Sequence, residues 1–273
     1  MLYSNLHTHT IYSDGKHTVE ENILSAIDKG MVSLGFSDHS CTDFDFSYCI
    51  KTEKLAQYVT EIPQMREKYR GQIEIYLGLE CDGFTTLANR GIYDYIIADC
   101  HYVKRGGVYF SVDHTRDVQQ DAINNAFGGD ALAYAKAYFA TYAELVPAMH
   151  PDVLGHFDLC TKFGLMPEED PEYMRAALEA LDAALSSCKI FELNTGAISR
   201  GYKPLYPAPY LLNYIREHGG KINLSSDSHH RDNLIFYFDE AAAILADAGF
   251  DSVVILHGGK WEEVGISELG GRK

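Results

Sequence analysis

The chain has 273 residues, of which 46% are hydrophobic and 23% charged, so it can bury a large core and has the composition of a folded globular protein. Its 39 acidic and 23 basic residues give a net charge of −16. A surface of this charge repels nucleic-acid phosphate, which argues against non-specific binding of DNA or RNA. The sequence shows no secretion signal, no apolar run long enough to span a membrane and no CxxC pair among its six cysteines, so we expect reduced thiols in a cytoplasmic protein.

Short apolar runs alternate with amphipathic stretches along the chain. In chain order, the pattern predicts a strand at 5–7, a helix at 18–29, a strand at 32–37, a helix at 52–69, strands at 74–79, 93–99 and 153–156, a helix at 171–187, a strand at 190–193, a helix at 209–218, a strand at 221–225 and a helix at 238–248. An eighth apolar run at 252–256 is a candidate for one more strand of the set. The alternation of strands and helices predicts an α/β fold with parallel strands, of the βα-barrel type.

Local signals support these boundaries. Thr18 stands three residues before Glu21, which is the spacing of a capping box at the start of a helix. Pro209 opens the helix that Gly219 and Gly220 follow. The segment 106–147 is irregular and is predicted to form a loop or hairpin, followed by a helix near 131–146. No polar linker divides the chain, so residues 1–273 are expected to form a single domain.

Polar and ionisable side chains stand at the carboxyl end of each of the seven predicted strands. They are His7, His9, Asp38, His39, Glu80, His101, His156, Asp158, Asn194, Asp227 and His229. In a βα barrel these strand ends open onto one face, so the side chains are expected to converge on one cleft. Buried carboxylates and imidazoles must be paired or must bind a cation, and this mixture favours two to three divalent ions of Zn, Mn or Fe over Mg or Ca.

Other candidate ligands are set aside. Cys81 and Cys100 flank Glu80 and His101, but adjacent strand residues face opposite sides, so both are interpreted as buried thiols. The remaining histidines are assigned surface roles, except that His257 is left open. The four assigned to the surface are His17, His114, His150 and His218.

The ordered motifs resemble the polymerase and histidinol phosphatase (PHP) superfamily over residues 5–230. They are His7-x-His9-Thr10, Ser13-Asp14-Gly15, Ser37-Asp38-His39, Gly78-x-Glu80, His101, Gly155-His156-x-Asp158 and Ser226-Asp227-x-His229. Asn194-Thr195-Gly196 with the following Arg200 resembles the histidinol-phosphatase branch. The resemblance implies a distorted (β/α)7 barrel of TIM-like type, with one PHP-type phosphoesterase domain and an active site at the carboxyl ends of the strands.

The resemblance also implies a ligand set for three metal ions. One ion would take His7, His9, Glu80 and Asp227, a second would share Glu80 and take His101 and His156, and a third would take Asp14, His39 and His229. The chain departs from the family after the fifth strand, where members often carry an arginine and this chain reads Leu159-Cys160-Thr161-Lys162.

The implied activity is that of a metal-dependent phosphatase, most simply an L-histidinol-phosphate phosphatase of histidine biosynthesis, which yields histidinol and phosphate. A hydroxide bridging two ions would attack phosphorus, with Glu80 as the bridging ligand. Arg200 would clamp the phosphate, with Lys162 and His230 as lesser candidates. Asp158 would orient a ligand or carry a proton, with a purely structural role as the open alternative.

The expected partner is a small phosphorylated substrate, with neither nucleic acid nor a membrane, and the sequence leaves the oligomeric state open. Three alternatives remain: a nucleotide phosphatase or nuclease-like phosphoesterase with the same site, a metal-dependent amidohydrolase, and a non-catalytic barrel. The amidohydrolase would also use an HxH pair and a late aspartate, but the additional His39, His101 and His229 suit phosphate better.

Overall fold

Seven parallel strands form the centre of the protein in a computed structural model that describes residues 2–202 and 205–269. The strands are β1 (Ser4–Asn5), β2 (Ser33–Phe36), β3 (Glu74–Asp82), β4 (Tyr95–Asp99), β7 (Val153–Leu154), β8 (Ile190–Asn194) and β9 (Lys221–Ser225). They lie side by side in chain order, and each neighbouring pair is parallel. A parallel bridge between Thr8 and Ser228 joins the segments that follow β1 and β9, which brings the two edges of the sheet together. The predicted parallel α/β barrel of seven strands is confirmed.

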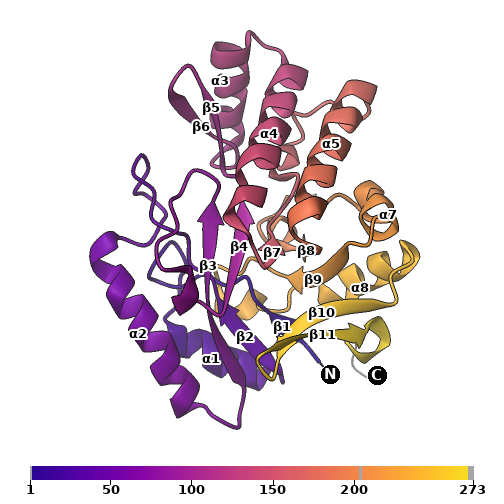
Figure 1. Cartoon of the computed structure of the whole chain (residues 1–273). Helices are drawn as coiled ribbons and strands as arrows, with labels where there is room; N and C mark the ends of the chain where they lie inside the picture. Colours follow the sequence, from indigo (N-terminus) through magenta and orange to yellow (C-terminus); the bar gives the residue numbers. More distant parts are fainter. Residues whose placement is uncertain (1, 203–204, 270–273) are drawn as a thin grey trace.

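The helices predicted between the strands are present and pack on the outside of the barrel (Figure 1). They are α1 (Val19–Asp28), α2 (Thr52–Lys68), α5 (Pro171–Ser187), α7 (Pro209–Glu217) and α8 (Phe238–Asp247). Thr18 caps α1 by accepting a hydrogen bond from the Glu21 N–H, and the Glu21 carboxylate accepts one from the Thr18 N–H in return. Short helical turns complete the connections, namely α6 (Gly196–Ser199) and the 3-10 turns Arg90–Ile92, Pro147–Met149, Leu159–Thr161, Arg231–Asn233 and Ile266–Glu268.

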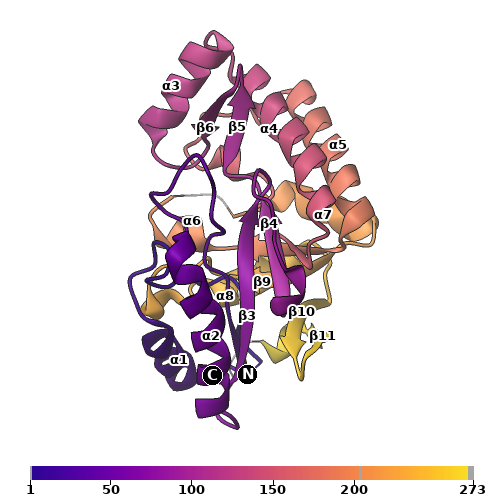
Figure 2. The same ribbon diagram turned by 60° about the vertical axis from the view of Figure 1, so that its left-hand side comes forward.

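The segment between β4 and β7 stands beyond the carboxyl ends of β3 and β4 (Figures 1 and 2). It consists of the antiparallel hairpin β5 (Tyr102–Arg105) and β6 (Val108–Ser111), then α3 (Arg116–Phe127) and α4 (Ala131–Leu145). The hairpin and the helix near 131–146 agree with the prediction. Helix α3 was not predicted, because its polar sequence buries little apolar surface beyond Ala122, Ile123 and Phe127.

The expectation that the run 252–256 adds an eighth strand to the barrel is wrong. It forms β10 (Ser252–His257), which pairs antiparallel with β11 (Lys260–Gly265) in a separate hairpin. Gly258 and Gly259 both have positive φ angles, 58° and 71°, and this two-residue turn sends the chain straight back. The hairpin packs against the barrel, where the Leu256 carbonyl accepts a hydrogen bond from Ser33 Oγ.

The barrel interior near this hairpin is apolar and tightly filled. Tyr95 is fully buried there and donates a hydrogen bond to the Leu6 carbonyl. Two glycines make room for its ring, since a Cβ at Gly35 would lie 2.3 Å from the Tyr95 hydroxyl and one at Gly78 2.2 Å from the ring. The interior beyond this layer, toward the carboxyl ends of the strands, is polar instead.

Two further features bear on the sequence analysis. Cys81 and Cys100 are fully buried and belong to the main hydrophobic core, as expected. Among the residues that the structure describes, no helix combines the length and the apolar character that crossing a membrane requires.

Candidate metal centre

The strand alternation aims polar side chains at the carboxyl end of the barrel. Tyr95, Ile97 and Asp99 alternate along β4 and therefore face the same side, as Gly78 and Glu80 do along β3. The loop after β1 is fixed by backbone hydrogen bonds across the closure of the barrel, from the His9 N–H to the Ser228 carbonyl and from the Ser228 N–H to the His7 carbonyl. Side chains from distant strands thus meet at one end of the barrel.

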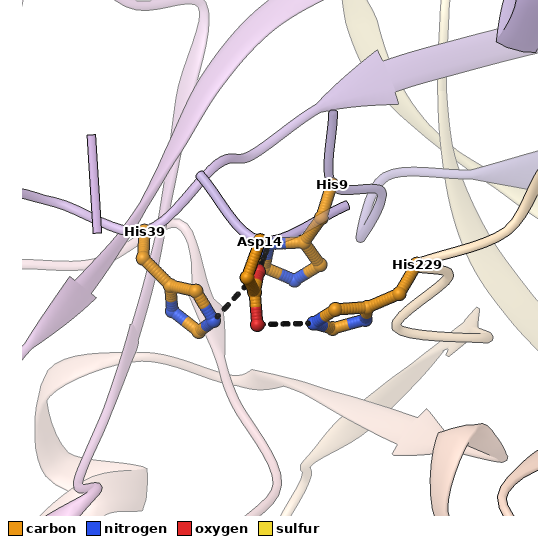
Figure 3. Close-up of side chains that lie close together, drawn as sticks. All are labelled: His9, Asp14, His39 and His229. Atoms are coloured by element: carbon orange, nitrogen blue, oxygen red, sulfur yellow. Dashed lines mark hydrogen bonds and ion pairs between the residues drawn. The ribbon is translucent and has the colours of Figure 1, made fainter. Parts of the chain in front are cut away.

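Figure 3 shows one group in which three imidazoles surround a carboxylate: His9, Asp14, His39 and His229. The Asp14 carboxylate lies 3.1 Å from Nε2 of His229 and 3.8 Å from Nε2 of His39. The His9 ring is stacked on that of His229, with centroids 4.1 Å apart. The structure therefore brings the predicted third set together and adds His9 to it.

Asp38 stabilises the loop that carries Asp14, because its carboxylate accepts several hydrogen bonds from that loop. It accepts hydrogen bonds from the Thr10 N–H at 2.8 Å, the Ser13 N–H at 3.1 Å and the Ser13 hydroxyl at 2.6 Å. The same loop requires Gly15, because a Cβ there would lie 2.5 Å from the His9 backbone. Asp38 is accordingly a structural residue of the site.

The Glu80 carboxylate lies at the centre of the cluster, fully buried and facing five imidazoles. Its Oε1 lies 3.0 Å from Nε2 of both His7 and His156 and 3.6 Å from Nε2 of His101. Its Oε2 lies 2.6 Å from Nδ1 of His39 and 3.5 Å from Nε2 of His9. The two oxygens of this carboxylate thus face different imidazoles, an arrangement compatible with the bridging role of Glu80, which stays a prediction.

Asp227 closes the cluster on the side of β9. Its Oδ1 lies 3.1 Å from Nε2 of His9 and 3.8 Å from Nε2 of His7, and its Oδ2 accepts a hydrogen bond from Arg200 at 2.7 Å. Its backbone is left-handed, with a φ of 45°, a conformation that non-glycine residues rarely adopt and that concentrates at functional sites.

The donor set fits metal ions. Four overlapping groups of His, Asp and Glu place one nitrogen or oxygen from each member within 4.8 Å of the others. They are His9–Asp14–His39–His229, Glu80–Asp99–His101–His156, His7–His156–Asp227 and His7–His9–Glu80. Several of these atoms are buried without a hydrogen-bond partner in the described residues, including Nε2 of His7, Nε2 of His9 and Oε2 of Glu80. Unpartnered buried lone pairs are costly unless a cation binds them, and imidazole with carboxylate suits Zn, Mn or Fe.

Burial and close neighbouring charges shift the pKa values of several groups in the cluster. Burial, with the imidazoles of His229 and His39 nearby, lowers the pKa of His9 to about 3, which keeps its ring neutral. Burial alone would lower the pKa of His39, but the carboxylates of Glu80 and Asp14 outweigh it and raise the pKa to about 9. Burial would raise the pKa of Glu80, yet the imidazoles of His39 and His7 hold it well below its usual range.

Glu192 contacts two histidines of the cluster, His7 and His156, and was not predicted from the sequence. Its fully buried carboxylate lies 2.8 Å from Nδ1 of His7 and accepts hydrogen bonds from the His156 N–H at 2.5 Å and the Ser225 hydroxyl at 2.6 Å. The contact with Nδ1 leaves Nε2 of His7 free to face Glu80. A signal was available, because Glu192 lies in the middle of an apolar strand, two residues before Asn194 and on the same face.

Asp99 is the second residue that the sequence analysis missed. It lies at the end of β4, fully buried, in the group of Glu80, His101 and His156. Its position two residues before His101 was the available signal, because the same spacing had been read as ligand-forming in His7-x-His9.

A cavity of about 680 Å³ opens over the cluster. Asp14, His39, His101, His156, Asp227 and His229 line its floor, and residues of the β5–β6 hairpin and of the start of α3 line a wall, including His114. Arg200 and Lys162 also line it. Lys162 Nζ lies 2.9 Å from the Asp113 carboxylate, so it reaches the cavity as half of an ion pair.

The other two predicted site residues lie away from this lining. Asp158 is fully buried, accepts a hydrogen bond from the Ala208 N–H at 3.0 Å, and has its pKa raised to about 7 by burial. His230 is half-buried, and its Nδ1 lies 3.5 Å from the Asp232 carboxylate. The structure brings neither side chain to the cavity floor, and their roles remain predictions.

Comparison with known proteins gives one family and several relatives. Residues 5–196 match the model of the PHP domain. A protein named "probable histidinol-phosphatase" from Deinococcus radiodurans is 27% identical over 93% of this chain and 96% of its own length. A protein of the same name from Schizosaccharomyces pombe is 26% identical over 93% of this chain and 89% of its own length.

A solved structure resembles the fold. The histidinol phosphate phosphatase of Lactococcus lactis, crystallised with zinc, L-histidinol and phosphate, matches with a TM-score of 0.66 at 22% identity, over 95% of this chain and 98% of that chain.

Proposed function

Because the chain belongs to the PHP domain family, we propose that it is a metal-dependent phosphomonoester hydrolase whose substrate is L-histidinol phosphate. The observation that carries the proposal is the cluster of imidazoles and carboxylates that follow β1, β2, β4, β7 and β9 around Glu80 of β3, several of which line one cavity together with Arg200. The two relatives named above match nearly the whole chain, which supports the choice of histidinol phosphate.

We infer the residues that would hold the ions from the family resemblance, and their clustering in the structure supports the assignment. Glu80 would be shared between two ions, one also held by His7, His9 and Asp227 and the other by His101 and His156, while Asp14, His39 and His229 would hold a further ion. When bound, such ions lower the pKa of water, so that a nucleophile exists near neutral pH, and neutralise charge on the phosphoryl oxygens.

Arg200 would bind and orient the phosphoryl group, and its position in the cavity lining supports this role. Its Nη2 donates to Asp227, which fixes the guanidinium beside the cluster, and about 35% of its side chain remains exposed toward the cavity. A planar guanidinium matches two phosphate oxygens, which a lysine ammonium does not. Lys162 supplies a second cation to the cavity, although its charge is shared with Asp113.

Acidic and aromatic side chains in the cavity lining would suit the cationic end of histidinol. Asp45 and Asp113 line the cavity together with the aromatic side chains of Tyr48 and Tyr102. The Tyr102 hydroxyl donates to the Asp45 carboxylate at 2.8 Å. Carboxylates near aromatic rings favour an ammonium and an imidazole over the uncharged base of a nucleotide. A volume of about 680 Å³ is sufficient for a small phosphate ester.

The test is a ranking of substrates by kcat/KM. Protein stripped with a chelator and reconstituted with Zn or Mn is assayed against L-histidinol phosphate, mononucleotides, p-nitrophenyl phosphate and single-stranded oligonucleotides. We expect L-histidinol phosphate to exceed each competitor by roughly a hundredfold, because the site pairs buried charges with the amine and the phosphate together. A mononucleotide at the head of the ranking would overturn the substrate, and equal turnover by stripped protein would overturn the metal dependence.

A further inference from the structure

We propose that Asp99 is an additional ligand of the metal ion that Glu80, His101 and His156 hold. This inference rests on the metal-dependent function proposed above, because it concerns the same centre.

Asp99 is a buried carboxylate that accepts no hydrogen bond from the described part of the chain and faces only the imidazoles of His101 and His156. It is 0% exposed, and neither Oδ1 nor Oδ2 has a hydrogen-bond partner among residues 2–202 and 205–269. The equally buried Glu192 and Asp38 each accept several hydrogen bonds from neighbouring N–H and O–H groups. A buried carboxylate must be paired, neutralised or bound to a cation, so Asp99 differs from these two in needing a further partner.

The spacing of the four side chains suits one ion. Glu80 Oε1 lies 3.0 Å from His156 Nε2 and 3.6 Å from His101 Nε2, and Asp99 Oδ2 lies 3.6 Å from His156 Nε2. Ligands bound tetrahedrally at about 2.1 Å stand roughly 3.4 Å from one another. These three separations lie near that value, and all four ligand atoms lie within 4.8 Å of one another.

The neighbouring strand leaves room for this carboxylate. Gly155 follows β7, and a Cβ at that position would lie 3.0 Å from Asp99 Cβ and 3.3 Å from Asp99 Oδ2. A larger residue at 155 would therefore crowd Asp99 and Ile97. Gly155 stands directly before the proposed ligand His156. The same short segment therefore supplies His156 and leaves space for Asp99.

A competing role for Asp99 is to orient the His101 ring. Asp99 Oδ1 lies 3.1 Å from His101 Nδ1, but the two atoms do not have the geometry of a hydrogen bond, and both remain without a partner in the described residues. Asparagine retains an oxygen that can accept from an imidazole but has no negative charge for a metal ion, so the two roles separate experimentally.

The experiment compares Asp99→Asn and Asp99→Ala with the unaltered protein, using zinc alone as the probe. Chelator competition and elemental analysis give the affinity and the number of ions, and thermal unfolding is recorded with and without zinc. We expect both variants to bind one zinc ion at least about tenfold more weakly. Without zinc, both should unfold at the same temperature as the unaltered protein or higher, since an unsatisfied buried charge is removed, and the stabilisation by zinc should shrink.

Asp152→Asn is the matched control. Asp152 lies at the opposite end of the barrel, where its carboxylate accepts from the Ile96 N–H at 2.7 Å and pairs with Arg90. Its loss should lower the unfolding temperature equally with and without zinc and leave the zinc count unchanged.

The outcomes separate the two claims. If Asp99→Asn binds zinc like the unaltered protein, or if both variants lose stability in the absence of zinc as the control does, Asp99 is no ligand. If the unaltered protein binds zinc through Asp99 but hydrolyses none of the phosphate esters, the ligand stands and the proposed function fails.

Discussion

The two halves of the barrel interior differ sharply, although the same strands build both. The half near the β10–β11 hairpin is an apolar cluster of Leu6, Tyr76, Tyr95, Ile97, Val153 and Leu256. The half at the carboxyl ends of the strands holds buried histidines and carboxylates, several of them without hydrogen-bond partners in the described residues. Strand β4 passes through both, since Tyr95 and Ile97 belong to the first half and Asp99 to the second.

This difference separates stability from chemistry along the barrel axis. The apolar half is filled so closely that glycine is required at positions 35 and 78 beside the Tyr95 ring. The polar half keeps like and unlike charges buried at close range, which lowers stability until cations bind. Substitutions in the first half should therefore change unfolding with or without metal, whereas those in the second should change metal binding and turnover.

The largest effect on activity is expected at Glu80. Glu80→Ala removes a carboxylate whose two oxygens face five imidazoles, so metal content and turnover should fall together. We expect kcat/KM to drop by about a thousandfold or more, equivalent to about 4 kcal/mol. Elemental analysis beside the kinetic assay checks this, and full occupancy with near-normal kcat would show that Glu80 is not the bridge.

The apolar half should respond in the opposite way. Gly78→Ala places a Cβ 2.2 Å from the Tyr95 ring, and we expect about 3 kcal/mol less stability in denaturant unfolding, with or without metal. Gly91→Ala is the control, because a Cβ at Gly91 has no atom within 4 Å in the described structure. A loss for Gly78→Ala that appears only in metal-loaded protein would contradict the separation of the two halves.

Much of this organisation was predictable from the sequence, because it depends on local patterns. The strand and helix periods gave the order of the barrel, and the i, i+2 spacing of His7 with His9 and of Asp227 with His229 marked the strand ends that carry chemistry. These features depend only on residues close together in the sequence, whose relative positions follow from the local backbone conformation.

The parts that were missed depend on contacts between distant segments. Glu192 is an ordinary residue of an apolar strand until folding sets it against His7, 185 positions away. The run 252–256 has the same strand pattern as the barrel strands, and only the Gly258-Gly259 turn shows that it folds back into a hairpin. Asp38 stands at a predicted strand end, like the candidate ligands, but its carboxylate accepts hydrogen bonds from the N–H groups of Thr10 and Ser13.

A substitution at Glu192 tests how strongly its contacts with His7 and His156 affect metal binding and turnover. Glu192→Gln should keep the volume but places an amide N–H where the carboxylate accepts from His7, His156 or Ser225. We expect metal affinity and kcat/KM each to fall by about 10- to 100-fold. Glu168→Gln is a surface control with no contact to the cluster, since its carboxylate accepts from Tyr210. Unchanged zinc affinity in Glu192→Gln would show that the His7 contact has no effect on the metal.

Arg200 should give a smaller and more selective effect. Arg200→Ala removes a cation at the edge of the cavity but no proposed ligand, so we expect about a tenfold lower kcat/KM, weaker inhibition by inorganic phosphate and the same metal count. Arg200→Lys should recover only part of the loss, because an ammonium lacks the planar pair of donors. Phosphate inhibition equal to that of the unaltered protein would exclude Arg200 as the clamp and move the test to Lys162 and His230.

The smallest effect concerns the stability of the metal-free protein against pH. The pKa of His39 is raised to about 9 by Glu80 and Asp14 against the effect of burial, and the pKa values of His7 and His101 are also raised. A group with a raised folded-state pKa contributes stability that is fully present below its unfolded value, near 6.5, and is lost as the pH rises through the folded value. Without metal, the free energy of unfolding should therefore fall between pH 7 and pH 9, by on the order of 1 kcal/mol.

Metal should reverse this slope, because an ion binds the neutral imidazole and its affinity rises as protons leave. Denaturant unfolding at pH 7 and pH 9, with and without zinc, measures both trends in one protein. His39→Gln should flatten the metal-free slope, since it removes the group that holds a proton up to about pH 9. A metal-free protein equally stable at both pH values would mean that the polar half is less tightly coupled than its distances indicate, and the contrast with the apolar half would then rest on packing alone.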